Sequence, residues 1–277
     1  MPYARQKKIA AINDISGYGR CALTVSIPII SALKVQCCPV PTSILSNHTG
    51  YEDFFFDDYT DKMTPYIHQW KKMNLSFDGI LTGFLGSRKQ IEIVSDFITY
   101  FKKEKTLIIV DPIMGDHGKV YSTYTKDMCF DMRKLVGRAD IITPNLTEAC
   151  ILTDIAYKDA LWEPEEFIHI AQRLFALGPK KVVITGIPDK ENLINLVYEE
   201  NAEPYFSSTK KVSVERPGTG DIFASIIAAD AVNGCKLRKS VNRAEKFISE
   251  CLTRSEQLHI PKEDGVCFEE MLHLLTN

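Results

Sequence analysis

A glycine loop opens an apolar helix late in this chain, and it reads Pro217-Gly218-Thr219-Gly220-Asp221-Ile222-Phe223-Ala224. A helix N-terminus has free backbone N–H groups, and the helix dipole adds partial positive charge there. Gly218 and Gly220 have no side chain, so an anion can approach this backbone closely. The loop therefore predicts an anion-binding site at the start of the helix.

Asp221 lies in the first turn of that helix and allows two interpretations. An acid at this position can simply cap the helix N-terminus. It can also act as a general base beside the anion site, accepting the proton of an alcohol that attacks a phosphoryl group. The second interpretation gains weight when the other polar motifs of the chain are counted.

Strand-like apolar segments alternate with helical patterns along the chain. This order predicts an α/β fold with a largely parallel sheet and helices on both faces, in one domain spanning residues 1–277. Residues 193–198 and 211–214 have no helix between them and predict an antiparallel edge. The predicted strands are 8–12, 37–43, 79–82, 106–110, 141–142 and 181–184, and the predicted helices are 23–33, 59–74, 88–104, 146–153, 164–177, 221–232 and 237–253.

Polar residues follow two of these strands, where ligands bind in such sheets. Asp111 comes directly after residues 106–110, although Asp-Pro is also ordinary turn chemistry. The run Thr143-Pro144-Asn145-Leu146-Thr147-Glu148 follows the next strand and has the spacing of a capping box. Both roles are compatible, because an acid in a first helical turn can also hold hydrated Mg²⁺.

Gly-Thr-Gly-Asp at the start of a late apolar helix resembles the signature of the ribokinase-like superfamily of kinases. The resemblance implies a three-layer α/β/α sandwich with a central, mostly parallel sheet and an antiparallel edge. It also implies phosphoryl transfer from ATP, with Asp221 as the catalytic base. The backbone amides of Gly218, Thr219 and Gly220 would form the anion hole, with Thr219 also facing ATP.

The middle of the chain resembles the branch that contains pyridoxal kinases and hydroxymethylpyrimidine kinases. The resemblance implies that a strand-end set lines the ATP–Mg²⁺ site, with Asp111 and Glu148 as the metal carboxylates and Thr143 and Asn145 as their neighbours. Residues 183–186 resemble the next nucleotide-binding strand end, where Gly186 stands at a position that often holds Ser in the family. The matched ATP-site residues are Asp111, Asp116, Tyr121, Thr143, Asn145, Thr185, Gly186 and Thr219, of which Asp116 and Tyr121 belong to a flap at residues 116–124.

The run Ser46-Asn47-His48-Thr49-Gly50-Tyr51 resembles a mark of pyridoxal kinases. The resemblance implies that Thr49 contacts a pyridine substrate, with Tyr51 in the same loop. Nearer the N-terminus, Asn13, Asp14 and Ser16 are rival candidates for the ring contact, and Asp14 is preferred because it is nearest the predicted strand end. The Asp-x-Ser-Gly spacing there also resembles the pyrimidine kinases, so the preferred pyridoxal substrate has hydroxymethylpyrimidine as its alternative.

Other function classes fit the sequence less well. Gly17-x-Gly19-x-x-Ala22 imitates a dinucleotide-binding fingerprint, but the second predicted strand is not followed by the acid that the fingerprint requires. A non-catalytic binding protein on this fold would be expected to lose the base or the metal carboxylates, and Asp221, Glu148 and Asp111 are all present. There is no Walker-type phosphate loop, and a sugar kinase is a weaker alternative within the superfamily.

Composition limits the remaining possibilities. The net charge is -3 with no basic stripe, so a nucleic acid partner is not expected. Apolar runs are too short to span a membrane, and the first residues do not have the pattern of a signal peptide. The eight cysteines then predict reduced thiols and a cytoplasmic protein. A homodimer and a monovalent cation are implied only by the resemblance.

Overall fold

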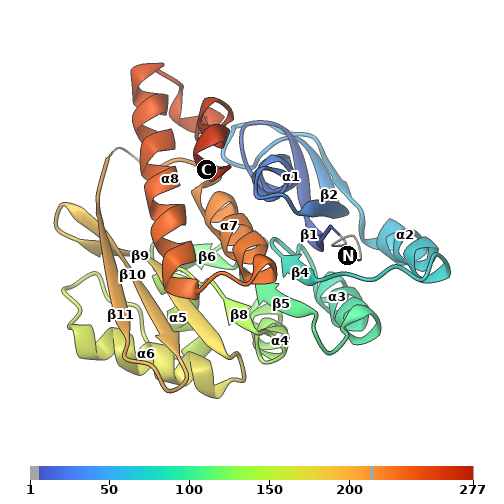
Figure 1. Ribbon diagram of the computed structural model, residues 1–277, viewed down its shortest axis with the longest axis horizontal. Helices are drawn as coiled ribbons and strands as arrows, with labels where there is room; N and C mark the ends of the chain where they lie inside the picture. The colour runs from blue at the N-terminus through green and yellow to red at the C-terminus, as the bar shows by residue number, and fades with distance from the viewer. Residues whose placement is uncertain (1–5, 213–214, 277) are drawn as a thin grey trace, which may run out of the picture.

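The computed structural model describes residues 6–212 and 215–276 and contains a nine-stranded sheet at its centre (Figure 1). The strand order is β11-β10-β9-β8-β5-β4-β1-β2-β3. The six strands from β9 to β2 run parallel, which confirms the predicted sheet type. They are β1 (Lys8–Tyr18), β2 (Gln36–Asn47), β4 (Gly79–Thr82), β5 (Leu107–Val110), β8 (Ile141–Ile142) and β9 (Lys181–Asp189).

Antiparallel strands lie at both edges of this sheet. At one edge are β10 (Asn192–Glu199) and β11 (Tyr205–Lys210), and at the other is β3 (Phe56–Asp58). The predicted second edge strand at 211–214 was wrong: Lys211 and Val212 follow β11, and residues 213–214 lie outside the described residues. The sequence pattern misplaced β11 because only Ser207 of that strand is buried, so its hydrophobic alternation is weak.

Helices cover both faces of the sheet, in the three layers that were expected (Figure 1). Alternate strand residues point to opposite faces: Ala10 and Ile12 of β1 pack in one core, and Ile9 and Ala11 pack in the other. The first face is covered by α2 (Thr60–Lys72), α3 (Arg88–Phe101), α4 (Lys126–Val136), α5 (Leu146–Thr153) and α6 (Pro164–Ala176), and the second by α1 (Ala22–Ala32), α7 (Thr219–Asn233) and α8 (Leu237–Gln257).

Three features of the fold lay outside the sequence prediction. β1 continues six residues beyond Ile12, because it keeps pairing with β2 after a register shift between Asn13 and Ile15. Helix α4 begins at a cap in which the Thr125 side chain accepts a bond from the N–H of Met128. A small hairpin of β6 (Gly115–Asp116) and β7 (Lys119–Val120) lies inside the predicted flap.

The start of α7 depends on a glycine. Gly218 is the N-cap residue and has a φ of +88°, in the left-handed region. A Cβ atom built at this position would lie 2.1 Å from the backbone oxygen of Arg20. The glycine loop is therefore pressed against the segment that connects β1 to α1.

We expect Gly218→Ala to lower the free energy of unfolding by about 1–3 kcal/mol, because alanine is strained at this φ and its methyl group would displace Arg20. Urea denaturation measures the change. Gly220→Ala is the matched control, because a Cβ there meets nothing within 4 Å. Equal stability of the two variants would show that the contact with Arg20 is loose.

Candidate active site

The carboxylate of Asp221 lies where the N-termini of two helices meet. Asp221 belongs to the first turn of α7, but its Oδ2 accepts a hydrogen bond of 2.8 Å from the backbone N–H of Ala22, the first residue of α1. Its Oδ1 accepts one of 3.1 Å from the Asn13 side chain. Burial raises the pKa of Asp221 although these two bonds lower it. The carboxylate therefore joins two helices and keeps a raised proton affinity.

The orientation of Asn13 is fixed by its own acceptors. Its Oδ1 accepts bonds from the backbone N–H groups of Asp14, at 3.0 Å, and Phe84, at 2.8 Å. The side-chain NH₂ group must then face Asp221. Asn13 was only a rival candidate for the substrate ring, and its contact with the predicted base could not be read from sequence because the partners are 208 residues apart.

Asp14 and Ser16 lie next to this pair on β1. The Ser16 hydroxyl, which is buried, donates to Oδ2 of Asp14 at 3.0 Å. Burial, and then the charge of Asp221, raises the pKa of Asp14 to about 7. The structure thus brings these two predicted substrate residues together beside the predicted base.

Asp111 and Glu148 form a second buried acidic pair. Oδ1 of Asp111 accepts a 2.9 Å bond from the Thr143 hydroxyl. Glu148 accepts from the backbone N–H groups of Met114, at 3.1 Å, and Asn145, at 2.9 Å. Burial raises the pKa of both carboxyl groups; the charge of Asp111 further raises that of Glu148, and Asp221 further raises that of Asp111. Asp111, which follows β5, therefore lies beside Thr143 and Glu148, which follow β8.

Asn145 has two structural contacts. Its Oδ1 accepts from the N–H of Glu148, which completes the predicted capping box of α5. Its NH₂ group donates to the backbone oxygen of Gly115 at 2.9 Å, at the base of the β6–β7 hairpin. The residue thus links the strand end to the predicted flap.

The two predicted flap residues behave differently. Asp116 is exposed, and its carboxylate accepts a bond from the N–H of His117. Burial of the Tyr121 hydroxyl, together with the negative charges of Glu148, Asp116, Asp111 and Asp221, raises the pKa of Tyr121. Both residues are exposed, but only Tyr121 has a protonated hydroxyl group close to the acidic cluster.

Thr185 and Gly186 do not end a strand as predicted, because β9 continues to Asp189 after an irregularity in its pairing with β10 at these two residues. The N–H of Thr185 donates to the oxygen of Pro144 at 2.9 Å, which ties this part of β9 to the segment before α5. Gly186 has a φ of +66°, a conformation that favours glycine over serine. Its N–H donates to the side chain of Asn195 at 3.0 Å. The departure from the family pattern is thus a backbone requirement.

The glycine loop has the free donors expected of an anion hole. The first bond within α7 runs from the N–H of Ile222 to the oxygen of Gly218, at 2.9 Å. The N–H groups of Thr219, Gly220 and Asp221 precede it and have no partner within the helix. The Thr219 hydroxyl makes a long contact of 3.4 Å to the oxygen of Arg216.

Thr49 and Tyr51 lie in the turn that follows β2. Thr49 is exposed, and no recorded contact joins it to Asp14 or Asp221 within residues 6–212 and 215–276. The Tyr51 hydroxyl donates to Oδ1 of Asp264 at 2.8 Å. The predicted substrate role of both residues stays a prediction, and Tyr51 has a partner that the sequence did not indicate.

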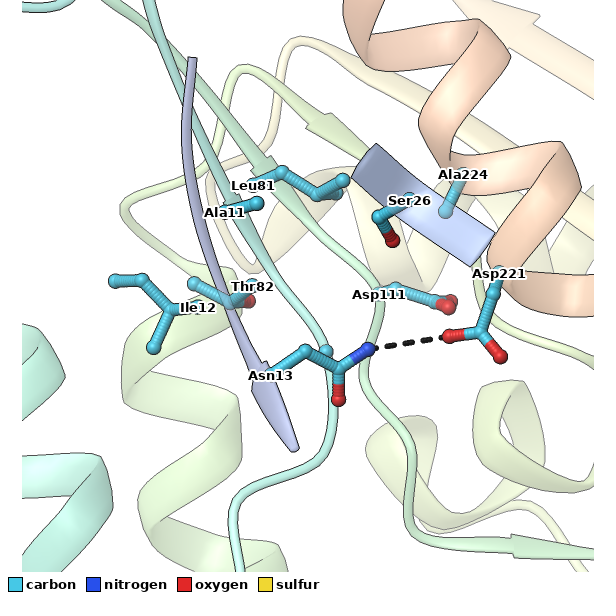
Figure 2. Close-up of a pocket in the computed structure, with 10 residues that line it drawn as sticks. Ala11, Ile12, Asn13, Ser26, Leu81, Thr82, Asp111, Asp221 and Ala224 are labelled. Carbon is cyan, nitrogen blue, oxygen red and sulfur yellow. Dashed lines mark hydrogen bonds between the residues drawn. The ribbon is translucent and has the colours of Figure 1, made fainter. Parts of the chain in front are cut away.

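A small cavity of about 10 Å³ lies beside Asp111 and Asp221 (Figure 2). Asn13, Asp111 and Asp221 line it, and the carboxylates of Asp111 and Asp221 point toward the same space. The buried hydroxyl of Thr82 also lines it and has no hydrogen-bond partner among the described residues. The volume is close to the 10–15 Å³ that one water molecule needs. Apolar residues, among them Ile12 and Leu81, complete the lining, so the cavity has room for about one water molecule beside the polar groups.

The donor set fits a magnesium ion brought in with a nucleotide. Asp111 and Glu148 supply carboxylate oxygens, which Mg²⁺ prefers. Burial is the main cause of the raised pKa of both groups, and a cation bound between them would favour their ionised forms. Among the described residues, no group of three or more His, Cys, Asp or Glu side chains forms a ready metal cage. Mg²⁺ commonly binds through one or two carboxylates with water and substrate phosphates, so two acids suffice.

Comparison with known proteins gives the family. The sequence model of the family described as phosphomethylpyrimidine kinase matches residues 27–266. The chain belongs to this kinase family. A protein of Bacteroides thetaiotaomicron, provisionally named a phosphomethylpyrimidine kinase, is 40% identical and superposes with a TM-score of 0.96 over 100% of this chain and 96% of that one. A second crystal form of that protein, with pyridoxal, gives a TM-score of 0.94, again at 40% identity, over 99% and 96% of the two chains.

Relatives of this kinase include enzymes named for vitamin B6. The pyridoxine/pyridoxal/pyridoxamine kinase of Bordetella avium is 26% identical over 92% of this chain and 90% of its own length. The pyridoxal kinase of Lactobacillus plantarum is 25% identical, with a TM-score of 0.89 over 98% and 97% of the two chains. The kinase assignment and the ribokinase-like fold expected from the sequence are thereby confirmed.

Two further expectations can be compared with the described part of this kinase. The eight cysteines, expected to be reduced buried thiols, are all free, but only Cys129, Cys150, Cys251 and Cys267 are buried and the other four are partly exposed. No helix in residues 6–212 and 215–276 is long and apolar enough to cross a membrane.

The raised pKa of Asp14 predicts a pH-dependent stability difference. Its folded pKa of about 7 lies above the unfolded value of 3.8, so the folded kinase binds a proton there that the unfolded chain has lost. This contribution is present at low pH and disappears as the pH rises toward 7. We expect Asp14→Asn, which resembles the neutral acid, to gain stability relative to the wild type by about 1–3 kcal/mol between pH 5 and pH 8.

Urea denaturation of both proteins across this pH range measures the difference. The other raised carboxyl groups are present in both proteins, and the difference therefore reports Asp14 together with its coupling to Asp221. A stability difference that stays constant with pH would mean that Asp14 is already ionised at pH 5 in the folded kinase.

Proposed function

We propose that this kinase transfers the γ-phosphoryl group of ATP to the 5′-hydroxymethyl group of pyridoxal, and also of pyridoxine and pyridoxamine, giving the 5′-phosphate in vitamin B6 salvage. The observation that carries the proposal is the position of Asp221: a carboxylate of raised pKa beside free N–H donors of α7. The pyridoxal found with the 40% identical relative supports the substrate class.

Asp221 would act as the general base. Its raised pKa brings its proton affinity closer to the pH at which a base works best. The bonds from Ala22 and Asn13 occupy one lone pair of each oxygen, so each oxygen keeps a second lone pair for the substrate hydroxyl. The carboxylate is thereby held in place while it takes the proton.

The N–H groups of Thr219, Gly220 and Asp221 would stabilise the negative charge on the transferring group. Mg²⁺ bound with ATP would neutralise charge on the phosphates, and Asp111 and Glu148 would hold it, partly through water. Thr143, Thr185 and Gly186 would lie along the nucleotide. The hairpin with Asp116 and Tyr121 would close over the site and exclude water, which otherwise accepts the phosphoryl group.

The competing function is phosphorylation of hydroxymethylpyrimidine or its phosphate. The name of the matching family and the Asp-x-Ser-Gly spacing at Asp14 favour it. Both reactions use the same base and anion hole, so they differ only in the ring that contacts Asp14, Ser16 and Thr49. A non-catalytic role on this fold would leave the paired acids without a purpose.

The deciding experiment measures Mg²⁺-dependent ADP release with pyridoxal, pyridoxine and hydroxymethylpyrimidine side by side. Turnover of the pyridoxal group with little or none of the pyrimidine is the expected result. Preference for the pyrimidine would replace the proposed substrate and keep the mechanism. Absence of turnover on all three would overturn the proposed function.

We expect Asp221→Asn to lower kcat by about 10²–10⁴-fold, because the base is lost. Asp127→Asn, which removes an exposed carboxylate of α4, is the control and should keep its activity. Unfolding is measured alongside, because an amide at residue 221 can turn an N–H donor toward Ala22 or Asn13. Turnover near the wild-type rate in a folded Asp221→Asn protein would contradict the assignment of the base.

We expect Thr49→Val to raise KM for pyridoxal by about fivefold, the effect of losing one hydrogen bond, and to leave KM for ATP unchanged. Steady-state kinetics with each substrate varied in turn measures both constants. A similar change in the two KM values would show that Thr49 supports the loop and does not contact the ring.

The proposal extends to the state of the protein in the cell. One domain covering residues 1–277 would act as a homodimer in the cytoplasm. The free cysteines support a reducing compartment.

The exposed run Phe54, Phe55 and Phe56 at the β3 edge supports burial against a second copy. Sedimentation velocity distinguishes monomer from dimer. A bound monovalent cation, implied only by the family, would show as activation by potassium.

A further inference from the structure

A turn near the C-terminus lies against the loops that would hold the substrate. This C-terminal turn, Pro261–Gly265, contains the single-turn helix η1 (Lys262–Asp264). Oδ2 of Asp264 accepts a 3.1 Å bond from the Tyr18 hydroxyl, and Oδ1 accepts a 2.8 Å bond from the Tyr51 hydroxyl. One carboxylate thus connects the end of β1 with the turn after β2, and it lies 246 and 213 residues away from the two tyrosines in sequence.

The loop after β2 has further contacts with the same turn. Nε2 of His48 lies 2.7 Å from the backbone oxygen of Glu263. The rings of His48 and Tyr51 are 4.8 Å apart, and those of Tyr18 and Tyr51 are 5.9 Å apart. Three aromatic side chains therefore form one group whose polar ends all face the C-terminal turn.

The backbone at Arg20 lies between this turn and the glycine loop. A Cβ built on Gly265 would lie 2.9 Å from the Arg20 backbone oxygen, and one built on Gly218 would lie 2.1 Å from the same atom. The Arg20 side chain also donates to the backbone oxygen of Asp264 at 3.0 Å and pairs with Glu269 at 2.7 Å. The β1–α1 segment is therefore packed between the C-terminal turn and the anion loop.

A buried arginine, Arg216, also contacts the C-terminal turn. Arg216 immediately precedes Pro217 and the glycine loop, and its side chain is only 4% exposed. Its guanidinium donates to the backbone oxygen of Pro261 at 2.9 Å and to Glu256 at 3.0 Å. Arg216 thus fixes the C-terminal turn to the anion loop and to α8, independently of the contacts with the tyrosines.

The two tyrosines are suited to act as donors to one acceptor. The hydrogen bond to Asp264 raises the pKa of Tyr18, and burial followed by the bond to Asp264 raises that of Tyr51. Both hydroxyls therefore stay protonated and both can donate to the carboxylate. Tyr18 is 57% exposed, so this contact adds little to the core and acts mainly on loop geometry.

We propose that Asp264 is a positioning residue that holds the turn after β2 against the end of β1 by binding Tyr18 and Tyr51 together. Asp14 and Ser16 lie on the strand that ends at Tyr18, and Thr49 lies two residues before Tyr51. The pairing of β1 with β2 ends at Tyr18 and Asn47, so the two tyrosines fix the turn beyond Asn47, and with it Thr49, relative to Asp14 and Ser16. The kinetic part of this inference rests on the proposed function.

The first test uses hydrogen exchange of the full chain without ligand. Asp264→Ala should lower protection in residues 14–20 and 46–51 and leave the other strand ends unchanged. Glu263→Gln is the matched control, because Glu263 contacts His48 through its backbone oxygen and not its side chain. Unchanged protection of both loops in Asp264→Ala would overturn the positioning role, whatever the kinetics show.

The second test is kinetic and separates positioning from general stability. Asp264→Ala should raise KM for pyridoxal by about 5- to 30-fold, the effect of two lost hydrogen bonds, with KM for ATP unchanged. Asp264→Asn keeps one acceptor oxygen and should recover part of the loss. Tyr18→Phe and Tyr51→Phe should add little in the Asp264→Ala background, because the shared contact is already gone.

The outcomes distinguish the two proposals. If the wild type turns over no vitamer while exchange increases in both loops of Asp264→Ala, the proposed function fails and the positioning role stands. If the wild type is active and Asp264→Ala changes both KM values equally, or the tyrosine variants add their full effects to it, the positioning role fails and the proposed function stands.

Discussion

The hydrogen bond from the Ala22 N–H to Asp221 organises the active end of this kinase. Ala22 has a φ of +53°, a left-handed conformation that costs a residue with a side chain about 1–2 kcal/mol. The bond to a carboxylate offsets that cost and directs the start of α1 toward the start of α7. The glycine loop before α7, the start of α1 and Asn13 of β1 meet at this junction.

Four carboxyl groups share the site, and burial raises the pKa of each: Asp14, Asp111, Glu148 and Asp221. Without a ligand their repulsion disfavours full ionisation. A nucleotide that arrives with a divalent cation brings the opposite charge to the same place. The electrostatics of these four groups are therefore complementary to a metal–nucleotide complex and unfavourable to a bare anion at the acidic pair.

The sequence predicted those parts of the site that are local. The glycine loop with Asp221, the strand end at Asp111 and the capping box of Asn145 and Glu148 each occupy a few consecutive residues, and each has the structure expected. The buried strands were found because their apolar runs are unbroken, whereas β11, with one buried residue, was misplaced.

Contacts between distant segments could not be read in this way. Asn13 binds Asp221, and Asp264 binds Tyr18 and Tyr51. These contacts depend on how the sheet and the C-terminal segment pack, and no spacing of residues in the sequence indicates them. Gly186 shows the same limit, since its departure from the family pattern is explained only by a backbone angle.

Asn13 also restricts how this chain can vary. Its oxygen accepts from two backbone N–H groups, so its amide cannot rotate by 180°, and its NH₂ group always faces Asp221. The side chain closest in shape, aspartate, would satisfy both backbone donors and yet place a second negative charge against Asp221. At position 13, therefore, a substitution that keeps the shape of the side chain is not a conservative one. Aspartate is closest to asparagine in shape, but its charge makes it one of the least favourable replacements.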